Sequence, residues 1–181
     1  MIVVALAGRR VDAGNALARF PAKRVPIVRD RVYAFLIERK AAAIVCSAAC
    51  GADLLALSAA GELGLRRRVV LPFAPERFRE TSVIDRGRDW GSAYDRVIGT
   101  VSAANDLVVL ENTGEGTESY ARTNLAILDE AQFLAARTGT PQTVLAAIVW
   151  DGAVRGPNDL TALFEAEARA RGLDVFEIPT L

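Results

Sequence analysis

The sequence predicts an α/β protein with a three-layer, doubly wound architecture, in which helices cover both faces of a mainly parallel sheet of about six strands. Short apolar runs alternate along the chain with stretches of helical length and periodicity, and this alternation is typical of parallel sheets. The runs at 2–7 and 143–150 are almost continuously apolar, as in strands that are buried on both faces. With 181 residues, 51% of them hydrophobic, the chain can bury a sizeable core as a single domain covering 1–181.

The first half of the chain predicts three strands. Pro21 and Pro26 disfavour a helix before residue 27, so 15–26 is expected to be a loop. Apolar residues then recur at helical spacing over 27–40. The elements expected in this half are a strand at 2–7, a helix at 27–40, a strand at 44–46, a helix beginning near Asp53, a strand at 67–71 and a short helix at 76–80.

The second half continues the alternation after a polar segment, 81–91, which is expected to be an exposed loop. Gly139 and Pro141 follow a long helical stretch and act as stop signals, while Asp159 is a suitable cap for the last helix. The expected elements are a helix at 90–104, a strand at 106–110, a helix at 118–137, a strand at 143–150, a helix from Asp159 to Arg171 and a strand at 173–178.

The charge and the amino-acid composition exclude several classes of function. The formal net charge is zero, whereas nucleic-acid binders normally carry a basic excess, so we expect no nucleic-acid partner. The chain has no histidine, which excludes His-containing metal sites and leaves acid–base chemistry to carboxylates, Tyr, Cys or Lys. We predict no metal, and no cofactor. Without an export signal or an apolar run of about 18 residues, the expected location is the cytoplasm and no membrane contact is expected.

The two cysteines, Cys46 and Cys50, are too few for a metal cluster or a disulfide framework. Cys46 is expected in the core. Cys50 has two interpretations, a thiol whose pKa is lowered at a helix start or a small buried residue, and we favour the second.

A binding site is expected at the carboxyl ends of the strands, where ligands bind in doubly wound sheets. A strand order near 3-2-1-4-5 would bring together the loops after the first, second and fourth strands. These loops offer glycines for close approach, N–H groups at helix starts and arginine donors for phosphate. The candidate ligand-binding residues in them are Gly8, Arg9, Arg10, Asp12, Ser47, Ala48, Cys50, Gly51, Ala52, Asp53, Gly114, Glu115, Gly116 and Thr117.

The stretch 43–64 allows two interpretations. Its strand, small-residue turn and helix would form a phosphate site, because the first turn of a helix has free N–H groups and a positive dipole end. The same residues would also make a tight, well-packed turn without a ligand. Gly114-x-Gly116-Thr117 lacks the lysine of a P-loop, and the first turn lacks G-x-G-x-x-G, so neither standard nucleotide motif is present.

Two further groups of side chains could reach the ligand. Tyr120 and Asn124 are four residues apart and share a helix face that either points into the crevice or is solvated. The segment after the third strand could form a basic, aromatic lid, or it could be an ordinary charged surface loop. Its candidate residues are Arg77, Arg79, Arg86, Arg88, Trp90 and Tyr94.

Two segments resemble motifs of the SLOG superfamily of Rossmann-like domains, which includes the LONELY GUY (LOG) phosphoribohydrolases and DprA-like proteins. Residues 45–53, VCSAACGAD, resemble its small-residue turn after the second strand, and 114–117, GEGT, resemble the end of the LOG motif PGGxGTxxE. The wider pattern resembles SLOG-like domains of uncharacterised bacterial proteins. It includes GRRxD at 8–12, LPF at 71–73, Phe78, Ser82-Val83, Asp89-Trp90 and WDG at 150–152.

Departures from the LOG motif bear on catalysis. Asn112-Thr113 replace its first glycines, and Tyr120 occupies the position of the LOG catalytic glutamate. Glu118 lies two residues earlier, about 200° around a helix, and is a poor substitute. Because hydrolysis of an N-glycosidic bond relies on carboxylates, the resemblance implies that the binding architecture is kept and the catalytic group is lost, so we predict no catalytic residue.

The resemblance therefore implies a sensor or partner domain that binds a nucleotide or nucleotide-derived ligand without turning it over. One alternative is a LOG-like nucleotide phosphoribohydrolase that uses Glu115, Glu118 or Asp53 in a rearranged site. Another is a structural or protein-interaction scaffold, and a DprA-like DNA binder is disfavoured by the zero net charge. The resemblance also allows a homodimer and a separate effector protein as partners.

Overall fold

The computed structural model describes residues 1–14, 16–86, 90–110, 116–137 and 143–181. They form one parallel sheet with the strand order β4-β3-β2-β1-β5-β6. The strands are β1 (Ile2–Gly8), β2 (Ala41–Cys46), β3 (Arg66–Leu71), β4 (Leu107–Val109), β5 (Thr143–Trp150) and β6 (Asp174–Pro179).

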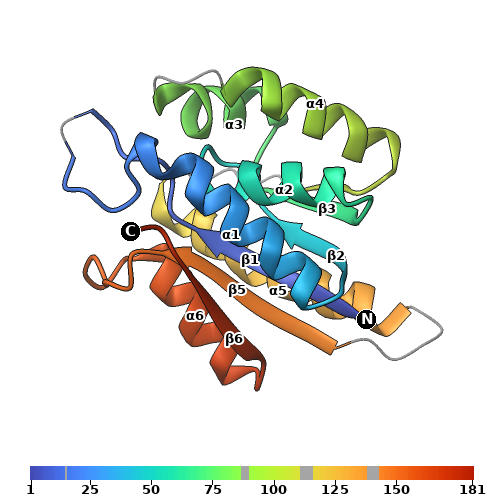
Figure 1. The fold of residues 1–181 in the computed structure, drawn as a ribbon. Coiled ribbons are helices and arrows are strands. Elements are labelled where there is room, and N and C mark those ends of the chain that lie inside the picture. Colours follow the sequence, from blue (N-terminus) through green and yellow to red (C-terminus); the bar gives the residue numbers. More distant parts are fainter. Residues whose placement is uncertain (15, 87–89, 111–115, 138–142) are drawn as a thin grey trace.

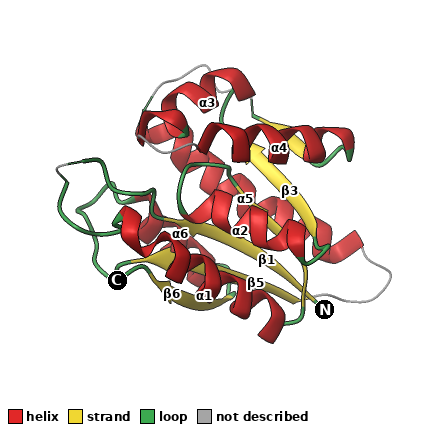
Figure 2. Cartoon of the chain, turned by 45° about the horizontal axis from the view of Figure 1, so that its top comes forward, coloured by secondary structure: helices red, strands yellow, loops and turns green. Residues whose placement is uncertain are grey.

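Helices cover both faces of this sheet (Figures 1 and 2). Alternate side chains of β1 point to opposite faces: Val4 and Leu6 belong to one core, and Val3 and Ala5 to the other. The first core is covered by α1 (Val25–Glu38), α2 (Ala52–Glu62), α3 (Pro75–Ser82) and α4 (Trp90–Ala103); the second is covered by α5 (Thr117–Arg137) and α6 (Leu160–Ala170). The three-layer doubly wound α/β fold is confirmed.

The fourth strand lies at the edge of the sheet, outside β3, whereas the order near 3-2-1-4-5 would have placed it beside β1. The structure places β5 there instead, paired with β1 from Ile2 to Gly8. Burial explains the difference: seven of the eight residues of β5 are buried, while the three residues of β4 are only half-buried. A long strand that is apolar on both faces gains most at the centre of a sheet, and a short one is better suited to an edge.

Local boundaries also differ from expectation. Helix α1 begins at Val25, after a short 3-10 turn over Ala22–Arg24, with Pro26 in its first turn. Proline is tolerated there because the first amides of a helix have no partner within the helix. The segment 81–91, expected to be exposed, contains the buried residues Ser82 and Val83 and a second 3-10 turn, Ile84–Arg86, before its undescribed part.

The order of strands places a topological switch point between β1 and β5, because the chain runs from β1 toward β4 in one direction and continues from β5 to β6 in the other. Crevices at such points are the usual ligand sites of open α/β sheets. The loops that follow these two strands lie together at the left of Figure 1, at the carboxyl edge.

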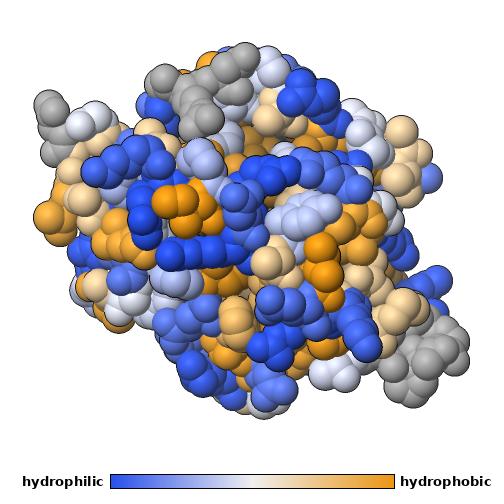
Figure 3. Space-filling view, in the orientation of Figure 1, coloured by the Kyte–Doolittle hydropathy of each residue, from blue (hydrophilic) through white to orange (hydrophobic). Residues whose placement is uncertain are grey.

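The outer surface mixes residue types. Figure 3 shows hydrophilic and hydrophobic residues interleaved over the face that carries α1. Ile27 and Ile37 of this helix are among its exposed apolar residues. Within the part of the chain that the structure describes, no helix has the length and hydropathy needed to cross a membrane.

Candidate functional site

A pocket of about 820 Å³ lies at the carboxyl edge of the sheet. Its floor is the end of β1, Leu6 to Gly8, and one wall is the first half of α5, with Tyr120, Thr123, Asn124 and Ile127. The other walls come from the β2–α2 turn, from α3 and the 3-10 turn after it, and from two loops at the switch point. Those remaining walls contain Arg9, Arg10, Asp12, Ala16, Leu17, Arg19, Ser47, Ala49, Asp53, Phe78, Ser82, Arg86, Val154, Arg155, Asn158, Asp159, Leu160 and Thr161.

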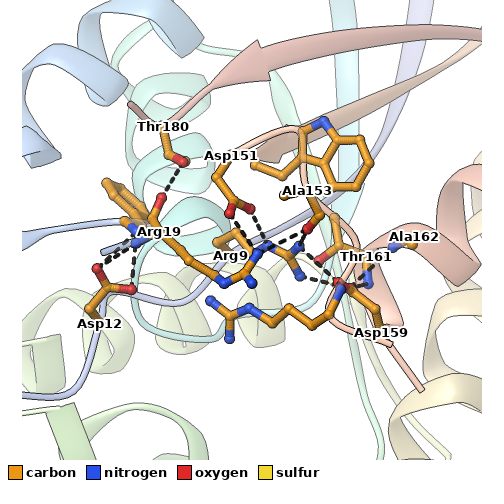
Figure 4. A network of polar contacts seen from close by, with 12 residues as sticks. Arg9, Asp12, Arg19, Asp151, Ala153, Asp159, Thr161, Ala162 and Thr180 are labelled. Carbon is orange, nitrogen blue, oxygen red and sulfur yellow. Dashed lines mark hydrogen bonds and ion pairs between the residues drawn. The ribbon is translucent and has the colours of Figure 1, made fainter. Parts of the chain in front are cut away.

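Arg9 ties the β1 end to the β5–α6 loop (Figure 4). Its Nε donates to Asp151 at 3.0 Å, and its two Nη atoms donate to the two oxygens of Asp159 at 2.6 and 2.8 Å. Nη2 also donates to the carbonyl of Ala153 at 2.7 Å, and the guanidinium lies over the Trp150 ring. Only 6% of Arg9 is exposed. Most of its donors are occupied by the chain itself, so its contribution to the site is to hold the loop in place.

Asp159 joins this network to the start of α6. Its Oδ1 accepts the amides of Thr161 and Ala162, which caps the helix, and its Oδ2 accepts the Arg155 amide at 2.7 Å. Burial alone would raise the pKa of the carboxyl, but the hydrogen bonds from Arg9 and the backbone amides lower that pKa to about 2. The carboxylate is therefore ionised at neutral pH and fully used by the fold.

The loop after β1 is closed by Asp12, whose carboxylate accepts the amides of Arg19 and Phe20. Arg19 in turn donates to Asp151 at 2.7 Å, so Asp151 lies between two guanidiniums (Figure 4). The hydroxyl of Thr180, near the C-terminal end of the chain, donates to the Arg19 carbonyl. These contacts hold Asp12 and Arg19, two residues of the pocket wall, close together.

The β2–α2 turn is closely packed against the β1 loop. The amide of Ala52 donates to the Arg9 carbonyl at 3.1 Å, and the amide of Cys50 donates to the Ser82 carbonyl at 3.0 Å. Gly51 has φ +103°, and a Cβ there would lie 2.7 Å from the Val11 nitrogen, so the close approach that its small size permits is used by the chain's own backbone. Of the two interpretations of 43–64, the packing favours the tight turn at these amides.

Asp53 gives this side of the pocket an unusual carboxyl. Burial raises its pKa to about 7, against the opposing effects of the Ala49 amide and the charge of Arg10. Oδ2 accepts that amide at 3.2 Å, while Oδ1 has no hydrogen bond with any described residue. Ser47 also lines the pocket, and its buried hydroxyl lacks a partner among the described residues. Both groups could therefore bond to a polar ligand.

Arg10 donates from Nη2 to the Cys50 sulfur at 3.5 Å and to Asp85, while its buried Nε has no partner among the described residues. Asp85 also pairs with Arg86 at 3.5 Å. Burial raises the pKa of the Cys50 thiol despite the neighbouring charge of Arg10, so the idea of a thiol with a lowered pKa is wrong. Cys46 lies in the core as expected, and its pKa is also raised by burial.

Helix α5 presents polar and aromatic groups to the pocket. The Tyr120 hydroxyl lies 2.9 Å from the Ser82 hydroxyl, and its ring contacts Phe73 edge-on. Asn124 donates to the Leu160 carbonyl at 2.8 Å, which links α5 to the start of α6. Of the two orientations considered for this helix face, the structure shows the one toward the crevice.

Among the residues predicted for the site, the pocket wall brings together Gly8, Arg9, Arg10, Asp12, Ser47, Asp53, Tyr120 and Asn124. Four predicted residues, Ala48, Cys50, Gly51 and Ala52, are buried in the turn beneath the wall. Gly116 and Thr117 are outside the wall. Gly114 and Glu115 lie outside the described residues.

The proposed lid separates into core and surface residues. Trp90 and Tyr94 are buried, and the Tyr94 hydroxyl donates to the Pro75 carbonyl, so these rings belong to the core. Arg79 pairs with Asp95, and Arg86 reaches the pocket wall, whereas Arg88 lies outside the described residues.

The main omission from the predicted site is the β5–α6 loop, which supplies Arg155, Asn158, Asp159 and Thr161. Placing the fifth strand beside β1 would have included it, and the long apolar run at 143–150 was the available signal. Phe78 and Ser82 belong to the SLOG-like pattern but were not predicted as site residues, and Arg19 had no comparable signal, because these three reach the pocket only through tertiary packing. Within the described residues, no group of three or more His, Cys, Asp or Glu is placed to hold a metal ion.

Comparisons with known proteins give a likeness of fold. No protein-family model and no curated protein sequence matches the chain. Among solved structures, the chain is similar to the crystal structure of DNA processing protein A (DprA) from Streptococcus pneumoniae, with a TM-score of 0.53 and 14% identity. The match covers 97% of this chain and 49% of that one, so this chain spans about half the length of the matched protein. It agrees, at the level of a Rossmann-like fold, with the SLOG resemblance.

Proposed function

We propose that this chain is a SLOG-like domain that binds a nucleotide or nucleotide-derived ligand in the pocket between β1, α5 and the β5–α6 loop, and acts as a sensor or partner module. The observation that carries the proposal is the combination of groups in one cavity at the switch point: arginines, open polar groups and aromatic side chains. A phosphorylated, ring-bearing ligand is complementary to this combination.

The size of the cavity supports a ligand of this class. Its volume of about 820 Å³ is within the range of about 300–1,000 Å³ that is usual for small-molecule sites. Tyr120 provides apolar area, while Phe78 is fully buried beside the cavity. Ser47 and Asp53 retain atoms without hydrogen bonds among the described residues. Such groups give orientation and specificity to an otherwise apolar site.

The carboxylates argue for binding rather than hydrolysis. Glycoside hydrolysis ordinarily uses two carboxyl groups that flank the scissile bond. Asp12 and Asp159 are engaged by backbone amides and Arg9, and Glu118 pairs with Arg122 outside the pocket wall. Asp53 is then the one described carboxyl of the wall with an oxygen free of hydrogen bonds to described residues.

Asp53 also supports a second candidate function. A carboxyl with a pKa of about 7 can donate a proton at neutral pH, as a general acid does. A LOG-like hydrolase with a rearranged site would use Asp53 in this role. It would release a free base from a nucleoside monophosphate, which chromatography of the incubated mixture detects.

A thermal-shift screen against nucleotides, cyclic nucleotides, NAD and ADP-ribose tests the binding proposal. A ligand at about 100 times its Kd stabilises the folded state by about 2.7 kcal/mol, which raises the Tm by about 5–10 °C for a chain of this length. Tyr120→Leu removes an aromatic ring from the wall and should reduce the shift. Phe133→Leu is the matched control, since Phe133 is an exposed ring on the same helix, outside the wall.

A shift that is reduced in Tyr120→Leu and retained in Phe133→Leu would support binding in this pocket. Folded wild-type protein that responds to none of the compounds would contradict the proposal and favour a protein-interaction scaffold. A salt-sensitive interaction with single-stranded DNA would favour the DNA-binding alternative.

A further inference from the structure

The switch-point side of the pocket carries a network of ion pairs. The guanidiniums of Arg9 and Arg19 both donate to Asp151, and Arg9 also binds Asp159. A third carboxylate, Asp12, is occupied by two backbone amides. The acidic side chains on this side are therefore already bonded before Arg155 is considered.

Arg155 brings a third guanidinium to the same wall. Its backbone amide is fixed by Asp159 at 2.7 Å, but its side chain has no hydrogen bond or ion pair with any residue that the structure describes. Arg155 is an exposed residue of the pocket wall. Partial desolvation of its guanidinium lowers its pKa, and the positive charges of Arg9 and Arg19 lower it further, with a smaller opposing effect from Asp151 and Asp159. Three guanidiniums and three carboxylates lie on this side, and Arg155 is the guanidinium among them that has no acceptor among the described residues. An anion beside it would supply that acceptor.

We propose that Arg155 binds the phosphate of the ligand, so that the phosphate lies against the β5–α6 loop and the uncharged part lies toward Asp53 and Tyr120. This inference rests on the proposed function and names the anionic end of the same site. It separates the phosphate from the Asp53 carboxyl, which would repel it when ionised. The wall around Arg155 also contains the polar side chains of Asn158 and Thr161.

The helix starts near the pocket are less suitable for the phosphate. At α6, the amides of Thr161 and Ala162 donate to the Asp159 carboxylate, and at α2 the amide of Ala52 donates to the backbone carbonyl of Arg9. Gly116 and Thr117, the described residues at the start of α5, are outside the pocket wall. A flexible guanidinium, with planar paired donors, is better placed to meet an incoming phosphate.

Isothermal titration calorimetry with the four common nucleoside 5′-monophosphates and the corresponding nucleosides tests the inference. In Arg155→Gln, the affinity for the monophosphate that the wild type binds should fall about tenfold to a hundredfold, as expected for the loss of charge-assisted hydrogen bonds. Affinity for its nucleoside should be unchanged. Arg155→Lys keeps the charge but not the fork of donors, and should retain part of the affinity.

The control is Arg169→Gln, which removes the same charge from an exposed position on α6, outside the pocket wall. If Arg155→Gln binds the monophosphate as tightly as the wild type does, or if both glutamine variants lose affinity equally, the inference is wrong and the proposed function stands. Equal affinity of the wild type for monophosphate and nucleoside would likewise overturn the inference alone. If the wild type binds no member of either series, the inference is wrong, and the proposed function fails with it only if the thermal-shift screen with cyclic nucleotides, NAD and ADP-ribose also gives no response.

Discussion

Asp159 offers a direct test of the network that holds the β5–α6 loop. Its pKa is about 2 in the folded protein, compared with an ordinary value of 3.8. At about 1.36 kcal/mol per pH unit, this difference corresponds to about 2 kcal/mol of folding stability at neutral pH. Because Asp159 is 5% exposed, screening by solvent reduces the figure little.

The substitution Asp159→Asn isolates the charge. Asparagine is a good N-cap, so α6 should keep its capping contacts while Arg9 loses an ionised partner. We expect the free energy of unfolding at pH 7 to fall by about 2 kcal/mol or more, since breaking a buried ion pair leaves the other charge uncompensated. Asp129→Asn, at an exposed residue paired with Arg171, should cost less than about 1 kcal/mol.

The pH dependence gives the sign of the effect. The folded pKa of Asp159 is depressed, so its contribution is present above pH 4 and is lost as the pH falls toward 2. The difference in unfolding free energy between the wild type and Asp159→Asn should therefore shrink to about half at pH 3. Urea denaturation at pH 7 and pH 3 measures it. Coincident unfolding curves at pH 7, or an equal difference at both pH values, would refute the assignment.

Three other substitutions test the site. Asp53 has a raised pKa, so the stability that its protonated carboxyl contributes is complete below pH 4 and declines by up to about 4 kcal/mol as the pH rises through 7. In Asp53→Asn, the free energy of unfolding in urea should not show this decline between pH 5 and pH 8. A difference between wild type and variant that is the same at both pH values would contradict the assignment. Gly51→Ala meets backbone within 3 Å and should cost more than about 2 kcal/mol, whereas Gly64→Ala, also at positive φ but in open space, should cost less; equal losses in thermal denaturation would exclude a packing role. Tyr120→Phe removes the hydroxyl bonded to Ser82 and should cost about 1 kcal/mol; coincident melting curves would contradict a stabilising role for this bond.

Local pattern was sufficient for most of the architecture. The continuous apolar runs at 2–7 and 143–150 identified β1 and β5, two adjacent interior strands of the sheet, and the helical stripe of Val28 and Val32 identified α1. Their order could not be read in the same way, because it depends on which long strand buries more surface beside β1. The boundary at Pro26 was missed because proline both disfavours the preceding residue in a helix and suits a helix's first turn.

Some site residues are placed in the pocket by local structure, and others by contacts with distant parts of the chain. Ser47, Asp53 and Tyr120 reach the pocket from turns or helix starts next to their own strands, which local pattern can locate. Gly51 was also identified from local pattern, but the backbone that approaches it belongs to Arg9 and Val11. A small residue at a turn therefore shows that something lies close to it, without showing whether that is a ligand or another part of the chain.

The arginines of the pocket likewise show that the sequence does not reveal which side chain keeps donors for a ligand. Arg9, in a glycine-arginine turn after a central strand, has the sequence setting of a phosphate ligand. Its partners, Asp151 and Asp159, lie 142 and 150 residues further along the chain, and they occupy most of its donors. Arg155 lies in a loop without a recognisable sequence motif. Asp159 is already bonded to Arg9 and to the Arg155 amide, so the Arg155 side chain has no acceptor among the described residues. Which of Arg9 and Arg155 can serve a ligand is therefore decided by the competition for these two carboxylates, and that competition exists only after β5 has paired with β1.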